Sequence, residues 1–108
     1  MGSKTTHAVT ELAPWLDVER QIIPGGLVFS VSGELDASNA GVFREALVTT
    51  IDSRERDQGD VIIVNLSRVS FVDSVGLGTL VAGLKHAIER GVRVRLAAGL
   101  PDGRRRMR

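Results

Sequence analysis

The strongest constraint on the fold is an apolar segment that leads through a polar turn into a helix. Residues 61–64 read Val-Ile-Ile-Val, and Leu66 extends a run without alternating polar positions. Such a run is typical of a strand that is covered on both faces and lies at the centre of a sheet. Asp73 and Ser74 then stand directly before an amphipathic segment. We therefore expect a strand-to-helix turn that carries an exposed serine.

Two segments have the periodicity of amphipathic helices. The first begins near Asp36 or Ser38, since either side chain can accept a hydrogen bond from a free N–H at a helix start. It ends before the polar loop 53–60. The second has Asp73 at its N-cap and ends at Gly91, which can take the left-handed conformation of a helix C-cap. The expected apolar faces are Phe43, Leu47, Thr50 and Ile51 in the first helix and Leu77, Leu80, Val81, Leu84 and Ile88 in the second.

Extended segments flank the two helices. Residues 16–23 and 27–32 are joined by Pro24-Gly25-Gly26, which predicts a β-hairpin. Residues 92–98 alternate apolar side chains with arginines, as a strand with one buried face does. Strands separated by single helices connect by right-handed crossovers and run parallel. The expected fold class is α/β: a small mixed sheet with an N-terminal antiparallel hairpin, the remaining strands parallel, and helices packed on it.

The chain has 108 residues, which suits one domain. We expect a flexible N-terminal tail at residues 1–14, a folded domain at 15–100 and a basic tail at 101–108. The arginines of the basic tail have no aromatic residue near them in sequence, which favours a solvated tail over nucleic-acid binding. Trp15 is interpreted as a core or hairpin anchor. No apolar run reaches the roughly 18 residues of a membrane span, and the absence of cysteine fits a cytoplasmic setting.

Catalytic readings of the turn lack the partner groups that they need. A nucleophilic Ser74 requires a base, but His86 lies roughly 18 Å further along the same helix at 1.5 Å per residue. Gly76 and Gly78 are not followed by the lysine of a phosphate loop. Asp36 and Asp73 are expected at one edge of the sheet, where two independent helix caps explain them more simply than a metal site. We therefore expect no catalytic residue, metal or cofactor. A small enzyme with a ligand at this edge is kept as a further hypothesis, after the two binding functions described below.

An exposed serine without catalytic partners is better placed to be modified than to catalyse. Phosphorylation would add about −1.5 to −2 charges at a helix N-terminus, which the helix dipole tolerates. A protein packed over that helix start would instead meet a buried, unpaired charge. One modification at Ser74 could therefore abolish binding and leave the fold intact.

Three sequence motifs resemble the STAS domain of bacterial anti-sigma factor antagonists over about residues 16–100. They are Gly33-Glu34-Leu35-Asp36, residues 61–67 and residues 69–80, the last containing Asp73-Ser74-Val75-Gly76-Leu77. The resemblance implies a partner-switching regulator of transcription in the bacterial stress response. In that family the antagonist binds an anti-sigma factor with serine kinase activity and frees a sigma factor. The kinase then phosphorylates the serine that corresponds to Ser74, and a phosphatase resets the switch.

The resemblance also implies a partner-binding surface and one departure from the family pattern. Family members continue into a C-terminal helix, which this sequence lacks, so we expect an apparently truncated domain that is either destabilised or self-associates through the uncovered sheet. The alternative function is a STAS module that scaffolds a larger signalling complex without switching. The implied partner-binding residues are Gly33, Glu34, Asp36, Asp73, Ser74, Val75, Gly76 and Leu77.

Overall fold

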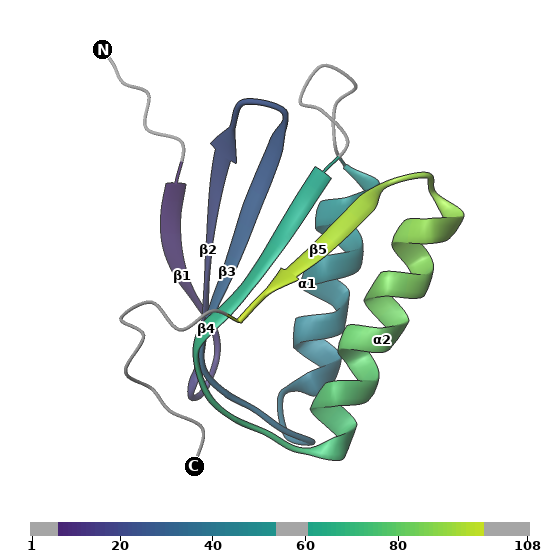
Figure 1. The fold of residues 1–108 in the computed structure, drawn as a ribbon. Helices are drawn as coiled ribbons and strands as arrows, with labels where there is room; N and C mark the ends of the chain where they lie inside the picture. The colour runs from purple at the N-terminus through teal and green to yellow at the C-terminus, as the bar shows by residue number, and fades with distance from the viewer. Residues whose placement is uncertain (1–6, 54–60, 99–108) are drawn as a thin grey trace.

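The computed structural model describes residues 7–53 and 61–98, which form a five-stranded sheet and two helices (Figure 1). The strands lie in the order β1-β2-β3-β4-β5; β1, β2 and β3 pair antiparallel, and β3, β4 and β5 pair parallel. The predicted mixed α/β sheet is therefore confirmed. The elements are β1 His7–Ala13, β2 Leu16–Ile23, β3 Gly26–Leu35, α1 Ala40–Asp52, β4 Val61–Val72, α2 Ser74–Glu89 and β5 Arg93–Ala97.

Local turn chemistry sets the hairpin and the end of α2 as predicted. Strands β2 and β3 pair up to Ile23 and Gly26, and Gly25 in the turn has φ +84°. Gly91 follows α2 with φ +74°. Both glycines occupy the left-handed region, which residues with a Cβ rarely adopt.

The prediction of a flexible tail over residues 1–14 is wrong for residues 7–13, which form strand β1. This strand pairs antiparallel with β2, from His7 opposite Gln21 to Ala13 opposite Leu16. Leu12 and Ala13 pack against the core. Because the segment shows no clear alternation of apolar and polar residues, its strand conformation comes from pairing with β2 and not from a local signal.

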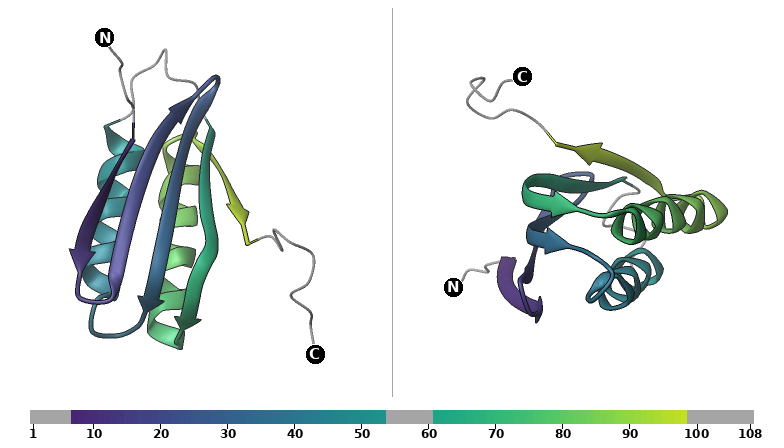
Figure 2. Two further views of the ribbon diagram at one scale, coloured as in Figure 1. Left: turned by 90° about the vertical axis from the view of Figure 1, so that its left-hand side faces the viewer. Right: turned by 90° about the horizontal axis from the view of Figure 1, so that it is seen from below.

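The two helices lie on the same face of the sheet (Figure 2). Ile62 and Val64 of β4 face them and are fully buried, whereas Val61 and Ile63 point to the other face and are half-buried. The expectation that this strand is covered on both faces is therefore wrong, although β4 does lie between β3 and β5. A strand with one covered face normally alternates apolar and polar residues. In residues 61–64 every position is apolar, so the sequence does not show which side chains are buried.

The core lies between the sheet and the two helices. Phe29 of β3 and Phe43 of α1 are fully buried, with ring centroids 6.2 Å apart in an edge-to-face arrangement. Phe43 belongs to the face that was predicted for this helix, and its other three members are also buried: Leu47, Thr50 and Ile51. The predicted buried face of the first helix is confirmed. The helix begins at Ala40 and not directly after Asp36 or Ser38.

Helix α2 buries a different face from the one predicted. Leu80 is the one member of the predicted stripe that is fully buried. Small residues make close packing possible on the buried side: Gly83 leaves space for Leu47 of α1, since a Cβ on Gly83 would lie 2.4 Å from Leu47 Cδ2. Four members of the predicted stripe remain half-buried or exposed: Leu77, Val81, Leu84 and Ile88.

The predicted basic tail 101–108 and the predicted absence of a C-terminal helix lie outside the described residues. Within the ranges that the structure describes, neither helix is long and apolar enough to cross a membrane.

Replacing Phe43 by alanine should lower the free energy of unfolding by about 3–5 kcal/mol, because the change opens a cavity against Phe29. Val42 is the matched control, since it is the neighbouring residue and is exposed. We expect Val42→Ala to cost less than about 1 kcal/mol. Urea denaturation of both variants measures the difference, and equal losses would contradict the assigned core.

Candidate functional site

The candidate site consists of two loops at one edge of the sheet. Strands β3 and β4 run parallel and end together, with Leu35 paired to Val72. Asp36 follows the first strand and Asp73 follows the second. The expectation that these two carboxylates reach the same edge is therefore confirmed. Open α/β sheets place ligand and partner sites at this carboxyl edge.

Asp73 joins the two loops. Its Oδ1 accepts a hydrogen bond of 2.8 Å from the Gly76 N–H, which caps the N-terminus of α2 as predicted. Its Oδ2 accepts a second bond of 3.0 Å from the Ala37 N–H in the other loop. The Asp73 N–H in turn donates to the Leu35 carbonyl at 3.2 Å. One carboxylate thus fixes the start of α2 and holds the loop after β3 beside it.

Asp36 stabilises its own loop. Its Oδ1 accepts hydrogen bonds from the Ser38 hydroxyl at 2.6 Å and from the Ser38 N–H at 3.0 Å. The hydroxyl bond is the main cause that lowers the pKa of Asp36, so this carboxyl is ionised at neutral pH. The N-cap position of α1 belongs to Asn39, which makes no side-chain capping bond. The interpretation of Asp36 and Asp73 as two independent helix caps is therefore correct for Asp73 and wrong for Asp36.

Asn39 is a positioning residue that the sequence analysis missed. It is 2 % exposed. Its Nδ2 donates to the Glu34 carbonyl at 2.9 Å and to the Pro14 carbonyl at 3.4 Å, and its Oδ1 accepts from the Asp36 N–H at 2.9 Å. A buried amide with its donor and acceptor satisfied can hold three backbone groups at once, here in the β1–β2 turn, at the end of β3 and in the loop after it. The sequence gives no periodic or motif signal for such a residue.

Two glycines of the predicted partner surface allow close backbone contacts. Gly33 has φ +108°, and a Cβ there would lie 2.0 Å from the Trp15 carbonyl oxygen. A Cβ on Gly76 would lie 2.6 Å from the Leu35 carbonyl oxygen, so this residue lets α2 begin directly against the end of β3. Both glycines therefore shape the edge from within, and their place in a partner-binding surface remains a prediction.

Ser74 is the first residue of α2 and is exposed. Among the described residues, no hydrogen bond involves its hydroxyl group. Three apolar side chains near it in sequence are also exposed: Phe71 at 51 %, Val75 at 49 % and Leu77 at 55 %. Phe71 was not among the predicted partner-binding residues. Large apolar side chains gathered around an exposed hydroxyl are typical of an interaction surface.

Trp15 lies in the turn between β1 and β2 at the same edge. Its carbonyl accepts a hydrogen bond of 2.8 Å from the Glu34 N–H. The side chain is 76 % exposed, so the interpretation of Trp15 as a core anchor is wrong. Its φ is +69°, a conformation forced by the tight turn that puts the backbone carbonyl against β3. The usual burial of tryptophan predicts a core position, and the residue type alone does not predict this turn.

The edge carries negative charge. The charged residues of segments 33–39 and 71–77 are Glu34, Asp36 and Asp73. His86, the histidine of α2, lies toward the other end of that helix, where its Nε2 is 2.7 Å from Asp52 Oδ1. This contact joins α2 to α1 and holds the His86 imidazole away from Ser74. No cluster of three or more histidine, aspartate or glutamate residues suited to a metal ion occurs in residues 7–53 and 61–98.

The family model for the STAS domain matches residues 17–108. This chain belongs to the STAS domain family. Its fold is therefore that of a STAS domain, and the resemblance deduced from the sequence motifs is confirmed.

Two solved anti-sigma factor antagonists are similar to this STAS domain. The antagonist from Mycobacterium paratuberculosis has 28 % identity and a TM-score of 0.63, with 85 % of this chain and 75 % of that chain covered. The antagonist SpoIIAA in its unphosphorylated form has 25 % identity and a TM-score of 0.58, with 81 % and 77 % covered. The anion transporter SLC26A9 shares the fold at 21 % identity and a TM-score of 0.62, and this chain covers 15 % of its length.

Gly76→Ala should destabilise the STAS domain by about 1–3 kcal/mol, because the new Cβ overlaps the Leu35 carbonyl. Gly78 is the matched control: it lies in the same helix, and a Cβ there meets nothing within 4 Å. Gly78→Ala should be neutral or stabilise by up to about 1 kcal/mol through helix propensity. Thermal melts followed by circular dichroism compare the two, and a larger loss in Gly78→Ala would refute the assigned packing.

Proposed function

We propose that this STAS domain is an anti-sigma factor antagonist that is switched by phosphorylation of Ser74. The unphosphorylated form binds an anti-sigma factor with serine kinase activity, so the sigma factor is released. Phosphorylation of Ser74 by that kinase ends the complex, and a phosphatase restores the binding form. The observation that carries the proposal is the exposed Ser74 hydroxyl at the first position of α2, on the edge fixed by Asp73.

The docking surface combines apolar and acidic groups. The exposed apolar surface of this edge belongs to Phe71, Val75 and Leu77. A partner that buries it would gain about 25 cal/mol of binding free energy per Å². Glu34 and Asp36 add negative charge beside it. A partner with an apolar patch and basic residues would complement this edge, and its positive charge would also speed association.

Gly78 supports the close approach of a partner. It lies one helical turn after Ser74, and the space where its Cβ would stand is open. A glycine inside a helix costs about 0.5–1 kcal/mol relative to alanine. Because no contact within the described domain requires Gly78, we assign its small size to contact with the anti-sigma factor.

Phosphorylation would change the charge of this surface and not its fold. A phosphate on Ser74 would meet the positive end of the α2 dipole, which stabilises it by about 0.3–1 kcal/mol. The nearby carboxylates of Asp36 and Asp73 oppose that effect. Since Ser74 is exposed and its hydroxyl group makes no hydrogen bond with residues 7–53 and 61–98, its modification breaks no hydrogen bond of the described domain. A docked partner would have to desolvate the phosphate, and that cost acts on binding alone.

The proposed site of action is the bacterial cytoplasm, where the kinase and the sigma factor operate. The alternative function is a STAS module that scaffolds a signalling complex and does not switch. The two functions differ in one property: binding by the scaffold would not depend on the charge at position 74.

Ser74→Glu should weaken binding to the cognate anti-sigma factor by about 2–5 kcal/mol, because it places a charge in the interface. The melting temperature should stay unchanged. Thr49→Glu is the matched control, since it adds the same charge at an exposed position of α1. Calorimetric titration of the wild type, Ser74→Glu and Thr49→Glu with the anti-sigma factor measures the three affinities. Equal affinities would favour the scaffold function. Incubation with the kinase and ATP should add one phosphate to the wild type and none to Ser74→Ala.

Trp15 should report the docking event directly. The chain has one tryptophan and no tyrosine, and that tryptophan lies exposed at the docking edge. We expect its emission to shift to shorter wavelength when an anti-sigma factor covers it, because the indole leaves water. Trp15→Phe supplies the background from the partner. An unchanged Trp15 emission at saturating partner would place the interface away from the β1–β2 turn.

A further inference from the structure

The face of the sheet opposite the two helices, here called the outer face, is open in the described structure. No helix or strand among residues 7–53 and 61–98 covers it, and both helices lie behind the sheet in the left view of Figure 2. Three apolar side chains on this face are half-buried: Val28 of β3, and Val61 and Ile63 of β4. Sheets of parallel strands such as β3, β4 and β5 are usually covered on both faces. The outer face therefore has the character of a surface that another chain segment covers.

Negative charge gathers on the outer face of β1 and β2. Leu16 and Val18 of β2 are buried toward the helices, so Asp17 and Glu19 point to the outer face. Glu11 of β1 pairs with Asp17 and therefore lies on the same face. Neither Glu11 nor Asp17 forms an ion pair with another residue in 7–53 and 61–98. Three carboxylates thus stand on one half of the open face.

The chain leaves the sheet in line with these carboxylates. Ala97, the last residue of β5, pairs with Asn65 of β4. On the same row Asn65 pairs with Ser30, and Ser30 pairs with Glu19 of β2. Neighbouring strands lie about 4.8 Å apart, so β2 is roughly 14 Å from β5 along this row. Residues 98–104 span about 20 Å when extended, at about 3.3 Å per residue. The residues that follow 104 therefore reach β2 and then β1.

A polar groove on the outer face follows this row. Its volume is about 260 Å³, and its polar side chains come from β2, β3 and β4: Glu19, Ser30, Ser32, Asn65, Ser67 and Arg68. Hydroxyl and amide oxygens of this kind accept hydrogen bonds from backbone N–H groups and from guanidinium groups. Arg68 offsets one of the three carboxylate charges, so this half of the face keeps a net negative charge.

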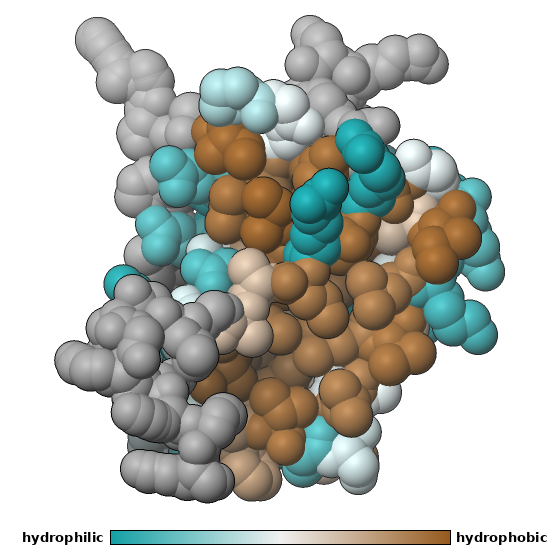
Figure 3. Space-filling model, in the orientation of Figure 1, coloured by the Kyte–Doolittle hydropathy of each residue, from teal (hydrophilic) through white to brown (hydrophobic). Residues whose placement is uncertain are grey.

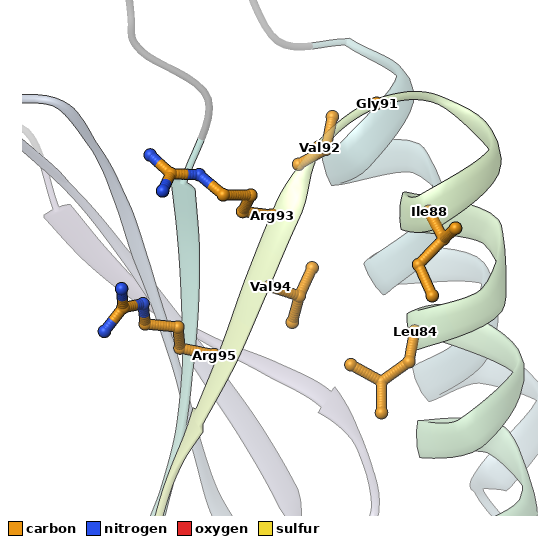
Figure 4. Close-up of a pocket in the computed structure, with 7 residues that line it drawn as sticks. All are labelled: Leu84, Ile88, Gly91, Val92, Arg93, Val94 and Arg95. Carbon is orange, nitrogen blue, oxygen red and sulfur yellow. The ribbon is translucent and has the colours of Figure 1, made fainter.

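The two arginines of β5 lie off this row. Arg93 pairs with Val61 and Arg95 pairs with Ile63, which places both toward the amino end of β4. Their side chains point away from α2 (Figure 4). A segment that leaves β5 at Ala97 and crosses toward β2 moves away from both arginines, and their repulsion falls with distance.

Residues 99–108 have the composition that this surface requires. They contain four arginines and one aspartate, which gives a net charge of +3. Leu100 comes early in the segment, where it can contact the half-buried apolar side chains of β3 and β4. The four arginines come later, at 104–106 and 108. A guanidinium group can form two parallel hydrogen bonds with one carboxylate.

We infer that residues 99–108 lie across the outer face of their own chain, with the arginine run on the carboxylates of Glu11, Asp17 and Glu19. The segment is joined directly to β5, so its effective concentration at this face is of millimolar order. A second copy or another basic protein at micromolar concentration competes poorly with it. In this arrangement β4 is covered on both faces, as its unbroken apolar run predicts.

The apolar groove between α2 and β5 is a less suitable place for this segment. Its volume is about 570 Å³, and Leu84, Val92 and Val94 line its apolar side (Figure 4). Figure 3 shows that the apolar surface continues over α2. The charged residues that line this groove are Arg93 and Arg95, with no carboxylate among the described lining residues. An arginine run would be repelled there, so charge favours the outer face.

A nitroxide spin label tests the inference, since the chain contains no cysteine. Met107→Cys attaches the label without changing an arginine. At low salt the labelled chain should lose the amide NMR signals of Asp17 and Glu19, because the label lies beside β2. Thr49, at an exposed position of α1, should keep its signal. Salt at 1 M should restore the lost signals, since the Debye length falls to about 3 Å. Equal intensities at the three amides at low salt would overturn the inference.

Charge reversal checks that opposite charges hold the segment. In the labelled chain, Asp17→Lys should restore the Glu19 amide signal. Glu45→Lys makes the same change of charge at an exposed position of α1 and should leave the signal loss unchanged. Adding Arg105→Glu to Asp17→Lys should bring the signal loss back, which separates a lost charge contact from a damaged sheet. Signal loss that persists in Asp17→Lys would overturn the assigned contact.

A mixed sample identifies the molecule that supplies the segment. Spin-labelled chain without ¹⁵N is mixed with ¹⁵N-labelled wild-type chain, so a lost signal can only come from a second copy. The Asp17 and Glu19 signals should stay intact in this mixture. Their loss would assign the segment to a second copy and overturn the arrangement within one chain.

The inference does not depend on the proposed function. The contact is measured without an anti-sigma factor and with Ser74 unchanged. If the outer face proves uncovered while Ser74→Glu still abolishes binding, the inference fails alone. If the segment contacts β2 while binding ignores the charge at position 74, the proposed switch fails alone.

Discussion

The structure of the candidate site depends on one carboxylate. Asp73 uses both oxygens, one for the Gly76 N–H at the start of α2 and the other for the Ala37 N–H in the loop after β3. A helix cap is usually a local device, worth about 0.5–2 kcal/mol. Here the same group also joins two segments that are 36 residues apart in the chain. The position of Ser74 is therefore set by the sheet, through Asp73, and not by its own contacts.

This separation of support from surface suits a phosphorylation switch. The groups that hold the edge are buried or engaged in bonds: Asn39 bonds to three backbone groups, and Gly76 lets α2 start against β3. The groups that face solvent, Ser74 with Phe71 and Val75, make no comparable contribution to the fold. A charge added to the second set acts on binding while the first set keeps the edge in place.

Features governed by local chemistry were predictable from the sequence. The Asp73 cap, the Gly25 turn and the Gly91 cap each follow from what one or two residues can do. The parallel arrangement of β3, β4 and β5 followed from the connections between them. The STAS motifs in the sequence also predict the edge that carries Ser74.

Features governed by tertiary contacts were not predictable. Strand β1 forms because β2 offers a free edge, and its own sequence lacks a strand pattern. Helix α2 is apolar over much of its circumference, so its period alone could not tell whether Leu77 or Leu80 faces the core. Small residues determine which face of α2 is buried, since Gly83 allows α2 to pack closely against Leu47 of α1. Trp15 is exposed because of a backbone turn that no side-chain preference reveals.

The central claim is that a phosphate on Ser74 changes the docking surface and leaves its support intact. Amide hydrogen exchange at Ala37 and Gly76, measured by NMR before and after phosphorylation of Ser74, tests this most directly. Both N–H groups donate to Asp73, so their protection reports the link between the loops. We expect unchanged protection in a phosphorylated chain that no longer binds its anti-sigma factor. Loss of protection at both amides would show that phosphorylation acts by opening the edge, and would contradict it.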